Sequence, residues 1–386
     1  MSQSRGGCTF HDSWFYPSVL DSDLQGTDLP DEIKAETRAC AWEYIRCVVP
    51  EFTNWNRYVA LARIIIIGIV AEFHGGIVDI VTDRRPLGYD LDELLDTIFA
   101  GTPGHEAMSR EYRTFLVVTA EKASENRNSE LFRRYVNALV HSPKDWFRLR
   151  DCDALARFTM TAALTCNDVD DEWFSEEEFQ ILTELGDTLY DAVAYYKHRA
   201  EGETNSTFAY VGGDLRSECY RQCREVLWAL DATWAPSRAR RHAVNFLRYF
   251  GGPIHMMMRR YRFTEEGLTI GRTETERVVH QTRENFKLWY RVDATDTIRP
   301  EHHLDRVASQ QGQLLFPGFL KKLENARTPR CHLCRYRTFY GAEASGKFGG
   351  VELCRACREE WRSYLTTFPD RAAEVLPITR GLTPTR

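Results

Sequence analysis

The chain has 386 residues, 43% of them hydrophobic, and carries a formal net charge of -6 at pH 7. This length and composition are typical of a globular protein with a large core and argue against a disordered chain. The charge gives no reason to expect a nucleic-acid binder. No apolar run reaches the length of a membrane span, and the first residues lack the apolar core of a signal peptide. We therefore expect a soluble, cytoplasmic protein.

Residues 1–28 are expected to be irregular, because glycines and prolines interrupt every helical period there. The first helix is predicted to begin at Asp31 and to end before Pro50. Its apolar positions recur at helical spacing, and Glu36 lies beside that stripe.

The second predicted helix is apolar almost all round from Val59 to Ala71, with Arg63 as the exception. A helix of this kind is normally buried. Glu72 continues it, and a carboxylate in that place must be paired, protonated or bound to a cation. A salt bridge to an arginine is the simplest interpretation.

Helical patterns continue through the rest of the chain, and alternating strand patterns are almost absent. The main predicted segments are Asp90–Phe99, His105–Ala123, Ser129–Val140 with Ser129 as the N-cap, Asp151–Thr165, Arg216–Trp234, Ala239–Phe250 and Thr273–Tyr290. We therefore predict an all-α fold, with one large helical domain over residues 29–326.

Two acidic clusters mark the centre of the chain. The string NDVDDE, which holds Asp168 and Asp171, follows one predicted helix, and Glu184, Asp187 and Asp191 share a face of the next. Carboxylates on neighbouring helices, with cations close by, can hold divalent metals against a polyphosphate. The alternative is a solvated helix end and an acidic surface face. The sequence contains no DDxxD motif, and its DxDD string is typical of protonation-initiated cyclisation.

The four paired cysteines form the most specific motif. Cys331 and Cys334 are separated by 19 residues from Cys354 and Cys357, which fits the spacing of a four-cysteine zinc site. Four thiolates leave no open coordination position, so we expect a structural Zn²⁺. Residues 327–386 are predicted to form a small zinc-ribbon-like module.

Several long stretches resemble the fungal α-ionylideneethane synthases, which are sesquiterpene synthases of fungal abscisic-acid biosynthesis. They are CAWEYIRCVVPEFTNWNRYVALARIIIIGIVAEF, DCDALARFTMTAALTCNDVDD, LGDTLYDAVAYYKHRAEGETNSTFAY and GGPIHMMMRRYRFTEEGLTIG. The segment FGGVELCRAC and the paired cysteines are similar too, so the resemblance runs from about Trp14 through the cysteine module.

This resemblance implies a helical bundle of terpene-synthase type that acts on farnesyl diphosphate with Mg²⁺. It also implies a route of diphosphate loss, deprotonation, reprotonation and ring closure, which needs an acid and a base in the cavity. Glu36 and Glu72 match positions associated with essential carboxylates, as Mg²⁺ ligands or as proton-transfer groups. The other candidate catalytic carboxylates are Asp168, Asp171, Asp187 and Asp191.

Cations and aromatic rings supply the remaining candidates. Those for diphosphate contacts are Arg157, Lys197, Arg199, Arg259 and Arg260. Tyr190 and Tyr261 are candidates for the cavity wall, with ordinary core packing as the alternative role.

Two other interpretations stay open at this stage. A related terpene synthase with a different product would share the fold and the site, because the shape of the cavity decides how the cation cyclises. A non-catalytic helical scaffold whose zinc module binds a partner is the alternative from another class. Magnesium-dependent turnover of farnesyl diphosphate separates the enzymes from the scaffold.

Overall fold

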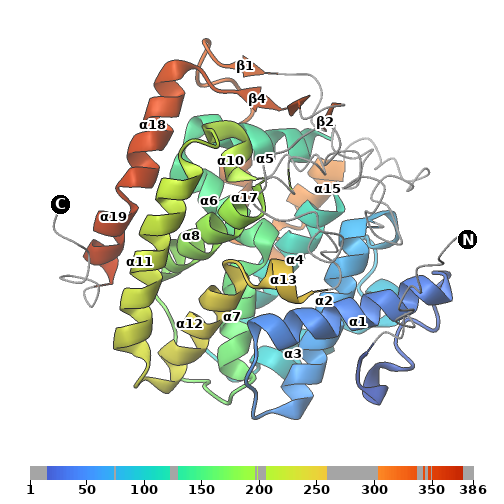
Figure 1. Ribbon diagram of the computed structural model, residues 1–386. Helices are drawn as coiled ribbons and strands as arrows, with labels where there is room; N and C mark the ends of the chain where they lie inside the picture. Colours follow the sequence, from blue (N-terminus) through green and yellow to red (C-terminus); the bar gives the residue numbers. More distant parts are fainter. Residues whose placement is uncertain are drawn as a thin grey trace, which may run out of the picture.

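The computed structural model describes residues 15–73, 75–121, 129–195, 198, 206–258, 303–336, 342–343, 347–348 and 350–376. Over these residues the protein is mainly α-helical, as predicted, with short strands only near the cysteines (Figure 1). No helix in this part of the chain is long and apolar enough to cross a membrane.

The N-terminal part consists of four helices, which pack on one another in sequence order. They are α1 (Asp31–Val48), α2 (Trp55–Phe73), α3 (Leu91–Phe99) and α4 (His105–Ala120). The 3-10 turn η1 (Ser18–Leu20) precedes α1, and η2 (Gly75–Ile77) and η3 (Pro86–Gly88) lie between α2 and α3. The predicted burial of α2 is confirmed. Every residue from Tyr58 to Ala71 is buried except Arg63, whose guanidinium reaches Asp23 at 3.1 Å.

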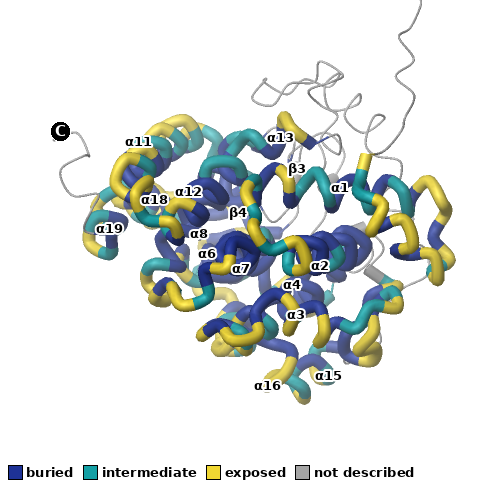
Figure 2. The backbone as a smooth tube through the Cα atoms, turned by 90° about the horizontal axis from the view of Figure 1, so that it is seen from below, coloured by how far each residue is buried: buried dark blue, intermediate teal, exposed yellow. Residues whose placement is uncertain are grey.

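The centre of the fold is built from four helices, which are α5 (Glu130–His141), α6 (Pro143–Ala154), α7 (Ala156–Thr165) and α8 (Glu176–Val193). Of these, α6, α7 and α8 are mostly buried (Figure 2). Every residue of α7 is buried. Ser175 and Glu178 form a capping box at the start of α8, which satisfies two backbone N–H groups there.

The predicted single helix over Asp151–Thr165 is wrong, because the chain breaks it at Leu155. Leu155 has a φ of 57° and separates α6 from α7. Ser142 accepts the N–H of Asp145 and Pro143 occupies the first turn, so α6 begins eight residues before Asp151. The sequence has no glycine or proline at the break, so nothing in its pattern marks the left-handed residue.

The later helices pack around the central ones. They are α10 (Thr207–Val211), α11 (Arg216–Trp234), α12 (Arg238–Phe250), α13 (Ile254–Met257), α15 (His303–Ser309), α16 (Gln311–Leu314) and α17 (Phe319–Asn325). Helix α11 packs against α8 and α12, and α13 packs against α1.

Two short antiparallel pairs and two helices form the C-terminal part. Strands β1 (Arg335–Tyr336) and β4 (Val351–Glu352) pair, as do β2 (Ala342–Glu343) and β3 (Lys347–Phe348). Helices α18 (Arg355–Thr366) and α19 (Phe368–Val375) then run along α11, and α19 also contacts α8 (Figure 1). The boundary predicted at residue 327 stays a proposal.

Candidate active site

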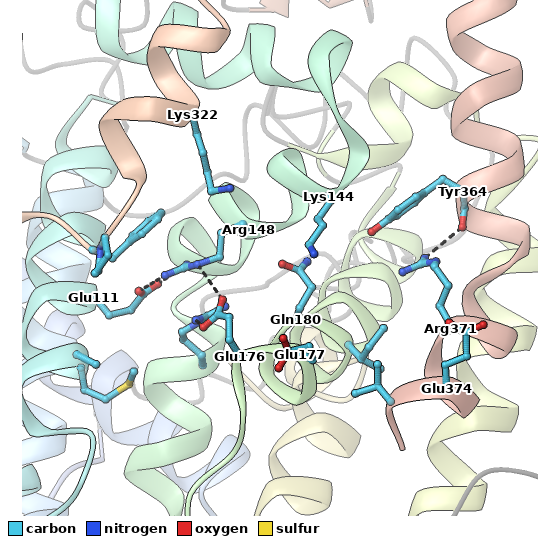
Figure 3. A pocket seen from close by; sticks show the side chains of 17 residues that line it. Glu111, Lys144, Arg148, Glu176, Glu177, Gln180, Lys322, Tyr364, Arg371 and Glu374 are labelled. Carbon is cyan, nitrogen blue, oxygen red and sulfur yellow. Dashed lines mark hydrogen bonds and ion pairs between the residues drawn. The ribbon is translucent and has the colours of Figure 1, made fainter. Parts of the chain in front are cut away.

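A pocket of about 660 Å³ lies where α4, α6, α7 and α8 meet the C-terminal helices (Figure 3). Apolar side chains make part of its wall, among them Met108, Ile181 and Phe316. Five cationic side chains also line it, namely Lys144, Arg148, Arg157, Lys322 and Arg371. Its volume is typical of sites that hold small molecules.

Two of these cations, Arg148 and Arg157, are buried and share carboxylate partners. Arg148 donates to Glu111 at 2.8 Å, and its guanidinium lies over the ring of Phe316, 3.6 Å from the ring centre. Arg157 donates its backbone N–H to Asp151 at 2.9 Å and a guanidinium N–H to Glu176 at 2.8 Å. Although burial acts to raise the pKa of Glu111, the charge and hydrogen bonds of Arg148 hold it below its ordinary value.

The pocket side of this cluster holds polar groups with unused hydrogen-bonding capacity. Of the two carboxylates that pair with Arg157 within the described residues, Asp151 is buried and Glu176 faces solvent, with 64% of its side chain exposed. Nη2 of Arg157 and Nε2 of Gln180 are buried and have no hydrogen-bond partner among the described residues. An anion that displaced Glu176 would meet a guanidinium whose geometry suits carboxylate or phosphate.

A second polar cluster lies on the opposite side of α6, because residues two apart on a helix point in nearly opposite directions. Arg150 donates to Asp191 at 2.7 Å and to Asp153 at 3.2 Å. Asp191 also accepts the backbone N–H of Thr207 at 2.8 Å. The sequence candidate Asp191 is therefore a buried ion-pair residue that joins α8 to α6 and α10.

Asp187 is the exception among these buried carboxylates. Its side chain is fully buried, and neither oxygen has a hydrogen-bond partner among the described residues. Burial raises its pKa well above the ordinary value, and the charges of Asp151, Asp191 and Asp153 raise it further against the effect of Arg150. Such surroundings favour the neutral, proton-carrying form of a carboxyl group.

Tyr190, a candidate for the cavity wall, lies in an aromatic group beside this cluster. Its ring stacks on Phe250 at 4.9 Å and lies 4.5 Å from His255 and 5.6 Å from His198. The guanidinium of Arg150 lies 5.7 Å from the centre of the same ring. Asp187, Asp191 and Tyr190 therefore come together on α8, whereas Arg157 pairs with Asp151 and Glu176.

Asp168 and Asp171 lie elsewhere, in the exposed connection between α7 and α8. Asp168 has a φ of 54° and accepts hydrogen bonds from Asn54 at 2.9 Å and Thr53 at 2.8 Å. These two bonds lower its pKa below the ordinary value. Its contacts are those of a residue that ties this connection to the start of α2.

The other candidates divide into two groups. Glu36 is 2% exposed on α1, and Glu72 is half-buried near the end of α2, which packs alongside α1. Lys197, Arg199, Arg259, Arg260 and Tyr261 lie outside the described residues.

The four cysteines gather at the start of α18. Their sulfur atoms all lie within 4.8 Å of one another, and they are the one group of metal-binding side chains of this kind within the described ranges. Cys331 Sγ lies 3.8 Å from Cys354 Sγ. A tetrahedral zinc ion about 2.3 Å from each sulfur places the sulfurs about 3.8 Å apart, so this donor set and this spacing suit Zn²⁺.

Sequence reasoning missed most of the partners in both clusters. Arg148, Arg150 and Asp151 lie in the run RLRDCD, and so many charges in a short run are typical of the exposed face of a helix. The signal that was available is Ser142-Pro143, which predicts a helix start and so places this run inside a helix that must pack. The contacts of Arg371 join residues far apart in sequence, which no local pattern reports.

Comparisons with known proteins agree on one family. The family model described as "Alpha-ionylideneethane synthase aba3" matches residues 12–378. An alpha-ionylideneethane synthase aba3 of Botryotinia fuckeliana (strain B05.10) is 60% identical over 95% of this chain and 83% of its own length. An alpha-ionylideneethane synthase abl3 of Leptosphaeria maculans is 57% identical over 98% of this chain and 88% of its own, and one of Pyricularia oryzae is 49% identical over 95% and 83%.

Proposed function

This chain belongs to the alpha-ionylideneethane synthase family, and from that premise we propose that it converts farnesyl diphosphate into α-ionylideneethane with loss of diphosphate. The reaction is a carbon–oxygen lysis followed by cyclisation, and the product is a precursor of abscisic acid. The matches extend over nearly the whole chain, which supports a shared reaction.

The structural observation that bears on the reaction is the buried Asp187 carboxyl, which is not among the residues that line the pocket in Figure 3. A route through neutral hydrocarbons needs a group that takes a proton from one intermediate and returns it to the next. A carboxyl group whose pKa is raised by burial, and which has no hydrogen-bond partner among the described residues, suits the return step. Asp191 holds Arg150 beside it, and Tyr190 supplies an aromatic face for a carbocation.

Two sets of cationic side chains are candidates for binding the diphosphate. The first set is Arg157 and Arg148, which both line the pocket. The exposed carboxylate of Glu176 accepts a hydrogen bond from Arg157 and so occupies the position that an incoming anion would take. The second set is the other proposed diphosphate ligands, Lys197, Arg199, Arg259 and Arg260, and Tyr261 is a further proposed cavity-wall residue; all five lie outside the described residues. If Arg157→Gln raises KM for farnesyl diphosphate and Arg259→Gln does not, the first set binds the substrate.

The two metals have different support. Zn²⁺ would be held by Cys331, Cys334, Cys354 and Cys357, and it would supply structural cross-linking. Mg²⁺, with Glu36 and Glu72 as its proposed ligands, would neutralise the leaving diphosphate. Within the described residues, the four cysteines are the one group of three or more metal-binding side chains that lie together, so Glu36 and Glu72 stay proposed ligands. Asp168 and Asp171 also remain catalytic candidates, although they lie in the exposed connection between α7 and α8.

The deciding experiment incubates the protein with farnesyl diphosphate, with and without Mg²⁺, and analyses the volatile hydrocarbons. An ionylideneethane formed only with Mg²⁺ supports the proposal, and another sesquiterpene supports a related synthase with a different product. No turnover by folded protein would favour a non-catalytic scaffold.

A matched pair of variants tests the role of Asp187. Asp187→Asn keeps the size of the side chain but removes the transferable proton, so we expect turnover to fall about 10²- to 10⁴-fold. Asp92→Asn changes an exposed carboxylate of α3 in the same way, and we expect unchanged turnover. Normal turnover of folded Asp187→Asn would exclude Asp187 as the acid.

A further inference from the structure

The C-terminal helices bind the central helix α8 through one buried carboxylate. Glu184 is fully buried and accepts a hydrogen bond from the hydroxyl of Tyr364 at 2.8 Å and one from Arg371 Nη1 at 3.0 Å. Arg371 Nη2 donates to the other oxygen of the same carboxylate and, at 3.1 Å, to the backbone carbonyl of Tyr364. Asp187 follows Glu184 by three residues, on the same side of α8.

The same two side chains also form a wall of the pocket in Figure 3. The guanidinium of Arg371 lies over the ring of Tyr364, 3.8 Å from its centre. Tyr364 stacks in turn on Phe147 of α6, with ring centres 6.1 Å apart. Tyr364 and Arg371 therefore line the pocket and bind Glu184 of α8 at the same time.

Helix α18 carries this structure and begins at the cysteine cluster. Cys354 is its N-cap, Cys357 lies in its first turn, and the N–H of Cys354 donates to Cys334 Sγ at 3.3 Å. One turn further on, Trp361 is 2% exposed and donates its indole N–H to the carbonyl of Leu139 at 2.9 Å. A continuous set of contacts thus runs from the sulfurs through Trp361 and Tyr364 to Glu184.

We propose that metal binding at the four cysteines sets the position of α18 and α19, and that Tyr364 and Arg371 thereby hold α8 in the position that the reaction needs. Tyr364 and Arg371 are positioning residues for the conversion of farnesyl diphosphate, and this inference rests on the proposed function. A metal ion fixes the four cysteines relative to one another and so fixes the first turn of α18. Loss of the ion releases that turn.

The buried charge explains why the contact controls position as well as stability. A carboxylate at full burial is stable only with its partners in place. If Arg371 withdraws, Glu184 loses its ion-pair partner inside the protein, and the turn of α8 that bears Glu184 and Asp187 is destabilised. The alternative is that the C-terminal helices add stability and nothing more.

A pair of variants separates positioning from stability. Arg371→Met leaves Glu184 buried without its ion-pair partner, so we expect both a lower melting temperature and a lower kcat. The double variant Glu184→Leu with Arg371→Met removes both charges, and such replacements often restore stability. We expect the double variant to recover the melting temperature while kcat stays about 2- to 30-fold below wild type, the range typical of coupling through a packed network. Recovery of kcat together with stability would overturn the positioning role.

Tyr364→Phe is the conservative variant, because it keeps the ring contacts and removes one hydrogen bond to Glu184. We expect a smaller fall in kcat than for Arg371→Met, with KM for farnesyl diphosphate nearly unchanged. Equal effects of the two variants on KM and kcat would assign both residues to the pocket wall alone.

Hydrogen exchange tests the same coupling without using turnover. Zinc chelation in the full-length protein should increase amide exchange in α8 around residues 184–191, and leave exchange in α3 unchanged as an internal control. Unchanged exchange in α8 would refute the coupling. If α8 responds but the wild-type protein turns over no farnesyl diphosphate, the proposed function fails while the coupling stands.

Discussion

The buried Asp187 carboxyl predicts an unusual pH dependence of stability. Its folded pKa lies above the value of 3.8 expected in an unfolded chain, because burial penalises the charged form. Between those two pKa values the folded state holds a proton that the unfolded state has lost. The free energy of unfolding therefore falls by about 1.4 kcal/mol for each pH unit of that interval. Asp187→Asn has no such proton, so its stability relative to wild type should rise with pH at the same rate.

Denaturant unfolding at several pH values between 4 and 8 measures this difference, and each variant is compared with wild type at the same pH. Asp191→Asn is the control, because it removes the carboxylate that holds the buried Arg150. We expect that control to lose about 3–5 kcal/mol at neutral pH. If the relative stability of Asp187→Asn falls as pH rises, Asp187 is ionised and paired with Arg150, and its proposed role as a neutral acid is wrong.

Two further predictions concern the exposed connection and the cysteine cluster. Asp168→Ala removes the acceptor for Thr53 and Asn54 in an exposed connection and should cost about 0.5–1.5 kcal/mol in thermal or chemical unfolding, with turnover retained; loss of turnover at unchanged stability would instead assign Asp168 to catalysis. Cys354→Ser should lower the bound zinc, measured by elemental analysis, and lower the melting temperature together with it. Unchanged metal content in that variant would contradict the four-cysteine site.

The sequence allowed the fold class, the buried α2 helix and the four-cysteine cluster to be predicted, because each depends on local spacing. Helical period and Cys-x-x-Cys pairs are visible within a few residues. The face shared by Glu184, Asp187 and Asp191 was also predictable, but its surroundings were not. All three are fully buried, in place of the solvated acidic face that was the alternative interpretation.

The remaining features depend on contacts between distant segments. Glu184 pairs with Arg371, which is 187 residues away. Whether a carboxylate is paired or left alone decides its chemistry, and Asp187 and Asp191 differ in this respect although they lie one turn apart on the same face. Helical periodicity treats the two positions alike.

The one-residue break at Leu155 has a consequence for how this protein can change in evolution. Asp151 on α6 accepts the backbone N–H of Arg157 on α7, so the two helices are fixed in rotation relative to each other. One inserted residue would turn α7 by about 100° about its axis. Since every side of α7 is buried, that rotation would misplace a whole helix of core residues as well as Arg157. We therefore expect length variation among relatives to avoid residues 151–157 and to occur in the exposed connections instead.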